Sequence, residues 1–150
     1  MKFRSLAAKC KPVGLLLMLV AFMTSVSGDV KAGSTVSPKG AEVYFISPAD
    51  GDRVPASFVV RFGLRGMGVA PAGVEKTGTG HHHLMINVDD ISLDDPIMAD
   101  EAHRHFGGGQ SEVTLTLKPG RHRLRLVLGD HNHIPHNPPV MSDEITVIVE

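Results

Sequence analysis

The chain of 150 residues has a single cysteine, Cys10, and no tryptophan. Cys10 precedes an apolar run that we expect to be removed with an export signal, so the mature chain has no thiol. This lack of thiols excludes disulfides, zinc sites built on cysteine and cysteine nucleophiles. Histidine, methionine, aspartate, glutamate and asparagine remain as metal ligands, and the fold has to be stabilised by its hydrophobic core alone.

The chain also lacks the roughly 20 consecutive apolar residues that a membrane-spanning helix needs. Its N-terminal apolar run, residues 13–23, follows a segment, residues 1–11, with four Lys or Arg and no acidic residue. Small residues come next, among them Ser27 and Gly28, as at a signal-peptide cleavage site. We predict a Sec-type signal peptide over residues 1–28 and a periplasmic or secreted bacterial protein without a stable membrane span after cleavage. An uncleaved membrane anchor is the alternative.

Excess positive charge and common catalytic motifs are missing as well. Without the four basic residues of the signal, 11 Lys and Arg face 16 acidic residues, a net charge of −5 with neutral histidines. Nucleic acid is therefore not expected as a partner. There is no Gly-x-Ser-x-Gly motif, and Gly-Gly-Gly-Gln at 107–110 is not followed by the Lys-Ser or Lys-Thr of a phosphate-binding loop. We find no signal for a nucleophile.

From Glu42 onward, apolar residues recur with a period near two, in short runs separated by Gly, Pro and Asp. This pattern is typical of β-strands. A polar linker over residues 29–40 leaves residues 41–150 for one domain. Its spacing predicts an all-β, antiparallel, immunoglobulin-like β-sandwich of six to seven strands, although the Cys pair and core Trp of immunoglobulin domains are missing. The strands that we predict cover residues 43–46, 57–64, 81–88, 113–117, 122–128 and 145–149.

All nine histidines lie between residues 81 and 136, and six of them form three His-x-His pairs. This spacing places two imidazoles on one side of an extended strand, and imidazole is the commonest protein ligand for transition metals. Because antiparallel strands alternate in direction, we expect all three pairs at the same end of the sandwich. We predict a copper or zinc site there, with ligands from His81, His83, His103, His105, His131 and His133.

Three further residues are secondary candidates for this site. Met85 shares strand parity with His81 and His83 and offers a thioether suited to Cu(I). His136 lies in a loop stiffened by prolines, and Asp130 offers oxygen ligands or an acceptor for an imidazole N–H. His82 and His122 share parity with the core leucines of their strands, so we expect them to be structural.

Several motifs together resemble a family of small exported bacterial domains of unknown function. They are Gly-His-His-His-Leu at 80–84, His-Phe-Gly-Gly-Gly-Gln at 105–110 and Gly-Asp-His-Asn-His-Ile-Pro-His at 129–136, with Ser-Pro-Ala-Asp-Gly at 47–51 and Arg-Phe-Gly-Leu at 61–64. The resemblance covers about residues 42–150 and implies a single domain in the bacterial envelope, with no assigned activity. By analogy alone, the outward histidine pairs also resemble those of copper-handling periplasmic proteins and copper–zinc superoxide dismutases.

The leading functional prediction is a periplasmic protein that binds copper or zinc as a buffer, carrier or sensor. A small copper or zinc metalloenzyme would use the same histidines and leave one coordination position open. The third alternative is an interaction module that contacts another envelope protein or polymer and whose histidines respond to pH. We expect a binding protein rather than an enzyme.

Overall fold

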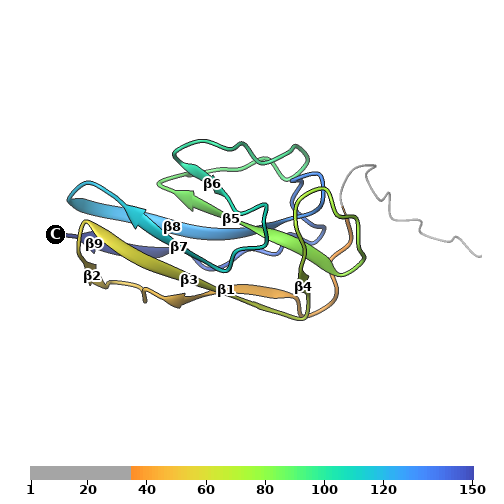
Figure 1. The fold of residues 1–150 in the computed structure, drawn as a ribbon, viewed down its shortest axis with the longest axis horizontal. Coiled ribbons are helices and arrows are strands. Elements are labelled where there is room, and N and C mark those ends of the chain that lie inside the picture. The colour runs from red at the N-terminus through yellow and green to blue at the C-terminus, as the bar shows by residue number, and fades with distance from the viewer. Residues whose placement is uncertain (1–34) are drawn as a thin grey trace, which may run out of the picture.

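The computed structural model describes residues 35–150, so the predicted signal peptide and most of the predicted linker lie outside the described residues. Residues 35–150 form nine strands in two sheets and contain no helix (Figure 1). A helix able to cross a membrane is accordingly not found in this range. The all-β prediction is confirmed, and the immunoglobulin-like topology stays a prediction.

The smaller sheet is antiparallel and has the order β1-β3-β7. Its strands are β1 (Glu42–Ser47), β3 (Ser57–Arg65) and β7 (Glu112–Thr116). The larger sheet has the order β2-β9-β8-β5-β4, with β6 also paired to β5. Its strands are β2 (Arg53–Val54), β4 (Gly68–Val69), β5 (Thr79–Ile86), β6 (His103–His105), β8 (Gly120–Gly129) and β9 (Ile145–Val149).

The six longer strands agree with the predicted ones to within two residues at each end. The short strands β2, β4 and β6 were not predicted, because two or three residues are too few to show an alternation of apolar and polar residues. The pairings of β2 with β9 and of β4 with β5 are parallel, which differs from the purely antiparallel prediction. The long pairings are all antiparallel, as expected.

The main core lies between the two sheets, where alternate residues of the facing strands meet. Leu84 of β5 is fully buried, as are Leu124 and Leu126 of β8, against Val60 and Phe62 of β3. These inward positions have the parity that the sequence predicts. Residues of the opposite parity in β5 and β8 therefore point away from the main core.

A second buried layer covers the outer face of the larger sheet. The segment between β5 and β6, residues 87–102, folds back over this face (Figure 1). Met85, Ile97 and Val127 form a separate apolar cluster beneath it. The amide of Ile97 also donates a hydrogen bond to the carbonyl of His133 (2.9 Å), which ties this segment to the loop after β8.

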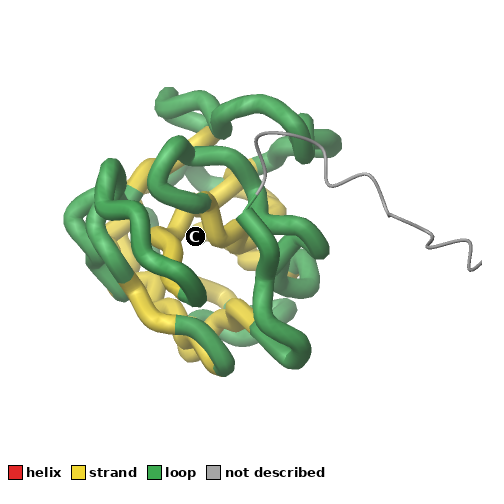
Figure 2. The backbone as a smooth tube through the Cα atoms, turned by 90° about the vertical axis from the view of Figure 1, so that its right-hand side faces the viewer, coloured by secondary structure: helices red, strands yellow, loops and turns green. Residues whose placement is uncertain are grey.

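The beginning of β5 and the end of β8 lie at the same end of the molecule, since His81 is paired with Gly129. This end is at the right in Figure 1 and faces the viewer in Figure 2, where loops gather over it. Residues 35–37 reach it too, because Ser37 donates its amide proton to the carbonyl of Asn137 (3.0 Å). The loops of this end surround the histidine-rich segments.

Candidate metal centre

His81 and His83 lie on the face of β5 that points away from the main core, and both side chains are 0% exposed. The ring of His82 points to the opposite side and lies 5.2 Å from the ring of Phe62. The predicted parity of the three residues is thus confirmed. Their burial was not expected from the sequence, and it arises because the second layer folds over the outer face.

His105 reaches the same place through strand β6, where it is paired directly opposite His83. From the sequence, His105 was expected at the same end of the sandwich as the other His-x-His pairs because it directly precedes strand β7. In the structure the hydrogen-bonded pairing with β5 positions it instead. Sheet register therefore brings the two imidazoles together across neighbouring strands, which are about 4.8 Å apart.

His133 comes from the loop after β8 and has a backbone φ of 69°, in the left-handed region. The loop is organised by the buried carboxylate of Asp130, which accepts hydrogen bonds from the amides of Asn132 (2.8 Å) and Ile134 (3.0 Å). Its other oxygen accepts the hydroxyl proton of Thr35 (2.7 Å). These hydrogen bonds hold the loop in the shape that keeps His133 in its strained backbone conformation. Strained non-glycine residues of this kind often occur at functional sites.

The four rings form one cluster, hereafter the histidine cluster: His81, His83, His105 and His133. Every pair of rings is in contact, with centroid separations from 4.7 to 5.9 Å. One ring nitrogen from each of His81, His105 and His133 lies within 4.8 Å of the others. These three residues, of which His81 is buried and the other two are partly exposed, could hold a metal ion.

Two glycines leave room for the rings. A Cβ atom at Gly129 would lie 2.8 Å from Nε2 of His83, and one at Gly107 would lie 2.4 Å from Cε1 of His105. Neither distance is compatible with ordinary van der Waals contact, which begins near 3.4 Å. A side chain at either position would therefore displace the neighbouring ring from its place in the cluster.

Burial makes these imidazoles poor bases. Desolvation, the larger cause, and mutual repulsion between the imidazolium forms together lower the pKa of His81 to about 4 and that of His83 to about 3. The pKa of His105 is lowered for the same two reasons. At neutral pH these three rings are uncharged, which is the state that binds a metal ion.

The buried rings of His81 and His83 each also carry one nitrogen without a hydrogen-bond partner in the described part of the protein. Nδ1 of His81 and Nδ1 of His83 lack hydrogen bonds among residues 35–150, while their Nε2 atoms lie 3.0 Å apart. A buried polar group without a partner costs about 1–3 kcal/mol. The unpartnered Nδ1 atoms of His81 and His83 therefore destabilise the folded protein.

The other two predicted ligands of the His-x-His pairs lie outside the cluster. His103 faces the same side of β6 as His105, but it is opposite Met85 and its Nδ1 is hydrogen-bonded to Asp100 (2.8 Å). His131 accepts a hydrogen bond from the side-chain amide of its neighbour Asn132 (2.9 Å). Each of these two pairs thus contributes one ring to the cluster, whereas the pair on β5 contributes both.

The secondary candidates have other contacts. Met85 packs in the apolar cluster with Ile97. One carboxylate oxygen of Asp130 is engaged by amides of its own loop and the other by the hydroxyl of Thr35. His136 is buried, with Nδ1 3.2 Å from the carbonyl oxygen of Leu128 and Nε2 3.2 Å from that of Thr79. Its ring packs against Gly80, where a Cβ would lie 2.8 Å from Cε1 of His136. These contacts give His136 a structural role in joining β5 to the loop.

His122 lies at the opposite end of β8, as predicted. Its ring nitrogens are hydrogen-bonded to the side chain of Asn87 (3.1 Å) and the carbonyl oxygen of Lys118 (2.9 Å). Thr35, Gly107 and Gly129 support the cluster but were not singled out in the sequence. A glycine beside a histidine motif was the only available signal for the latter two.

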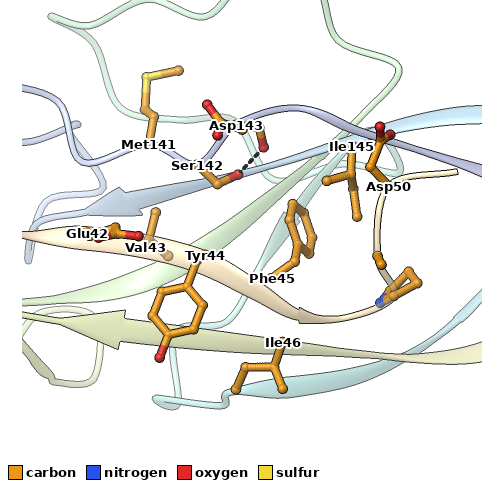
Figure 3. A pocket seen from close by; sticks show the side chains of 12 residues that line it. Glu42, Val43, Tyr44, Phe45, Ile46, Asp50, Met141, Ser142, Asp143 and Ile145 are labelled. Carbon is orange, nitrogen blue, oxygen red and sulfur yellow. Dashed lines mark hydrogen bonds between the residues drawn. The ribbon is translucent and has the colours of Figure 1, made fainter. Parts of the chain in front are cut away.

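A separate cleft lies between β1 and residues 141–145 (Figure 3), with a volume of about 480 Å³. The hydroxyl of Ser142 donates to the carbonyl of Asp143 (2.7 Å) and accepts the amide proton of Leu126 (2.9 Å). The cleft is lined by no histidine and presents no group of converging titratable side chains. The histidine cluster is therefore the better candidate site in residues 35–150.

The fold and the cluster define an all-β domain with a candidate histidine metal site. The chain belongs to the family described as domain of unknown function DUF4399, whose model matches residues 60–150. The matched range contains all nine histidines. Membership of a family of domains of unknown function is thereby confirmed for residues 60–150. The family motifs and export stay predictions.

No curated protein matches the chain. Among solved structures the chain is similar to the endo-beta-1,4-mannanase from Thermotoga petrophila, with 16% sequence identity and a TM-score of 0.41. The match covers 73% of this chain and 20% of the mannanase chain, so this protein spans about a fifth of that enzyme's length. A likeness of this size supports no conclusion about fold or activity.

Proposed function

We propose that this protein binds a copper or zinc ion in the bacterial periplasm and holds it with His81, His105 and His133. One observation carries the proposal: three imidazoles from three separate segments, β5, β6 and the loop after β8, lie with one nitrogen each within 4.8 Å of one another. Residues so far apart in sequence do not converge through local propensity. Their convergence indicates a common ligand.

The chemistry of the donors supports a transition metal. Ca²⁺ and Mg²⁺ take oxygen ligands, whereas imidazole suits copper, zinc, iron and nickel. The nearby carboxylate of Asp130 is already engaged by two amides and a hydroxyl, so it is not free to supply a hard oxygen. Among these metals, zinc and copper are the ions that sites built from imidazoles alone commonly hold.

A binding role, as buffer, carrier or sensor, is favoured over catalysis. The cluster is composed of imidazoles alone, and within the described residues no carboxylate or hydroxyl is hydrogen-bonded to any of its four rings. A metal-dependent hydrolase would need such a group to accept or deliver a proton. The proposal therefore assigns the site to holding the ion.

The test is metal content and affinity of the protein purified without a histidine tag. We expect elemental analysis to find copper or zinc, and calorimetric titration with each ion to show one site. His105→Ala and His133→Ala should each weaken binding more than tenfold, because each removes one ligand. The control His131→Ala should bind as the wild type does. Absence of metal and equal affinity in all variants would refute the proposal.

A further inference from the structure

We infer that His83 is a fourth ligand and that the histidine cluster forms a closed, tetrahedral, all-nitrogen metal centre. This inference rests on the proposed function and adds the coordination number and geometry. The ring of His83 is in contact with those of His81, His105 and His133. The same ring is fully buried, directly opposite His105 in the sheet.

The six ring separations distinguish between two geometries. With metal–nitrogen bonds of about 2.0–2.1 Å, each ring centroid lies about 3.1 Å from the ion, so four tetrahedral rings are all about 5 Å apart. Square-planar rings would instead show four separations of about 4.4 Å and two diagonals of about 6.2 Å. Five of the observed separations lie between 4.7 and 5.1 Å, and the sixth, between His83 and His133, is 5.9 Å.

The single long separation does not fit a square. If His83 and His133 were opposite corners, His81 and His105 would form the second diagonal, yet these two rings are only 5.0 Å apart. The arrangement is a tetrahedron with one edge lengthened. The group of nitrogens within 4.8 Å of one another contains His81, His105 and His133 but not His83. The His83 ring would therefore have to rotate toward the other three to complete the tetrahedron.

The ring nitrogens support the same geometry. Nε2 of His81 and Nε2 of His83 lie 3.0 Å apart, close to the tetrahedral edge of about 3.4 Å expected for such bond lengths. In the metal-free protein these two nitrogens share one proton in a hydrogen bond. An ion bound by both Nε2 atoms would take the place of that proton, which would move to Nδ1 of the donor ring, so that each Nδ1 would carry the N–H of a neutral ligand.

Two consequences follow for the ion and its path. Four protein ligands leave no position for water, which is the arrangement of structural rather than catalytic zinc sites. A tetrahedral site suits Zn²⁺ and Cu⁺ better than ions that prefer tetragonal geometry, such as Ni²⁺. Since His81 and His83 are buried while His105 and His133 are partly exposed, the ion enters between the last two.

Co²⁺ is a suitable probe because tetrahedral Co²⁺ absorbs visible light much more strongly than five- or six-coordinate Co²⁺. We expect the full-length protein titrated with Co²⁺ to give the intense tetrahedral spectrum. His83→Gln retains a side chain that can hydrogen-bond to His81 but removes the proposed ligand. We expect this variant to lose intensity severalfold, as water enters the site, and to bind Zn²⁺ more than tenfold more weakly. The matched control His131→Gln, outside the cluster, should change neither property.

The outcomes separate this inference from the function on which it rests. An unchanged spectrum and affinity in His83→Gln would show that His83 only positions His81, and the metal-binding function would still stand. Failure of the wild type to bind either ion would remove both. If His83→Gln does not fold, X-ray absorption spectroscopy of the zinc-loaded wild type decides: four imidazoles around zinc are expected, and three would overturn the inference.

Discussion

Gly129→Ala tests whether the space beside the histidine cluster is needed for metal binding. Gly129 is paired with His81, so a new methyl group would point to the same side of the sheet as the cluster. It would lie 2.8 Å from Nε2 and 3.1 Å from Cδ2 of His83, and 3.4 Å from Cα of His133. The His83 ring would have to withdraw by roughly 0.6 Å to restore ordinary contact.

This displacement should affect folding and metal binding differently. Overpacking of a buried site costs about 1–3 kcal/mol, so the metal-free variant should unfold several degrees lower. Metal–ligand distances tolerate only about 0.2 Å, and we therefore expect zinc affinity to fall about 10- to 100-fold. That loss corresponds to about 1.4–2.7 kcal/mol, which adds to the destabilisation of the zinc-loaded protein.

The assay is thermal unfolding with and without zinc, combined with calorimetric zinc titration. Gly68→Ala serves as the control, because its Cβ would meet only Cγ2 of Thr79 at an ordinary 3.4 Å. We expect Gly68→Ala to retain wild-type zinc affinity. Wild-type zinc affinity in folded Gly129→Ala would refute the reasoning, since it would mean that the His83 ring can move without consequence for the ion.

Two further predictions concern pH and the loop after β8. Because the pKa is lowered to about 4 in His81 and about 3 in His83, whereas unfolded histidine keeps a pKa of about 6.5, the unfolded chain binds more protons in acid. The metal-free protein should therefore lose stability as the pH falls from about 6.5 toward 3, and equal urea midpoints at pH 7 and pH 5 would contradict this. Asp130→Ala removes the acceptor of two amides and a hydroxyl, so we expect about 2 kcal/mol or more of destabilisation in urea unfolding and at least tenfold weaker zinc binding through His133. A variant that is destabilised but binds zinc normally would show that the loop keeps its shape without this carboxylate.

The sequence determined the strands and the side to which their residues point. Period-two alternation is local, because successive side chains of any extended segment point to opposite faces. It was enough to locate six strands, to separate His82 from His81 and His83, and to place β5 and the loop after β8 at the same end. These features require no knowledge of what packs against the strand.

Only the tertiary structure decided which rings meet and that they are buried. His103 and His105 lie on the same side of β6 and have the same chemistry, so the register of β6 against β5 alone brings His105, and not His103, opposite His83. In the loop after β8, the hydrogen bonds of Asp130 turn His133 toward the cluster, whereas His131 is bonded to Asn132. Burial of the site depends on residues 87–102 folding over the sheet, which is a long-range packing event. No local sequence pattern predicts this packing, because the contacts that produce it join residues far apart in the chain.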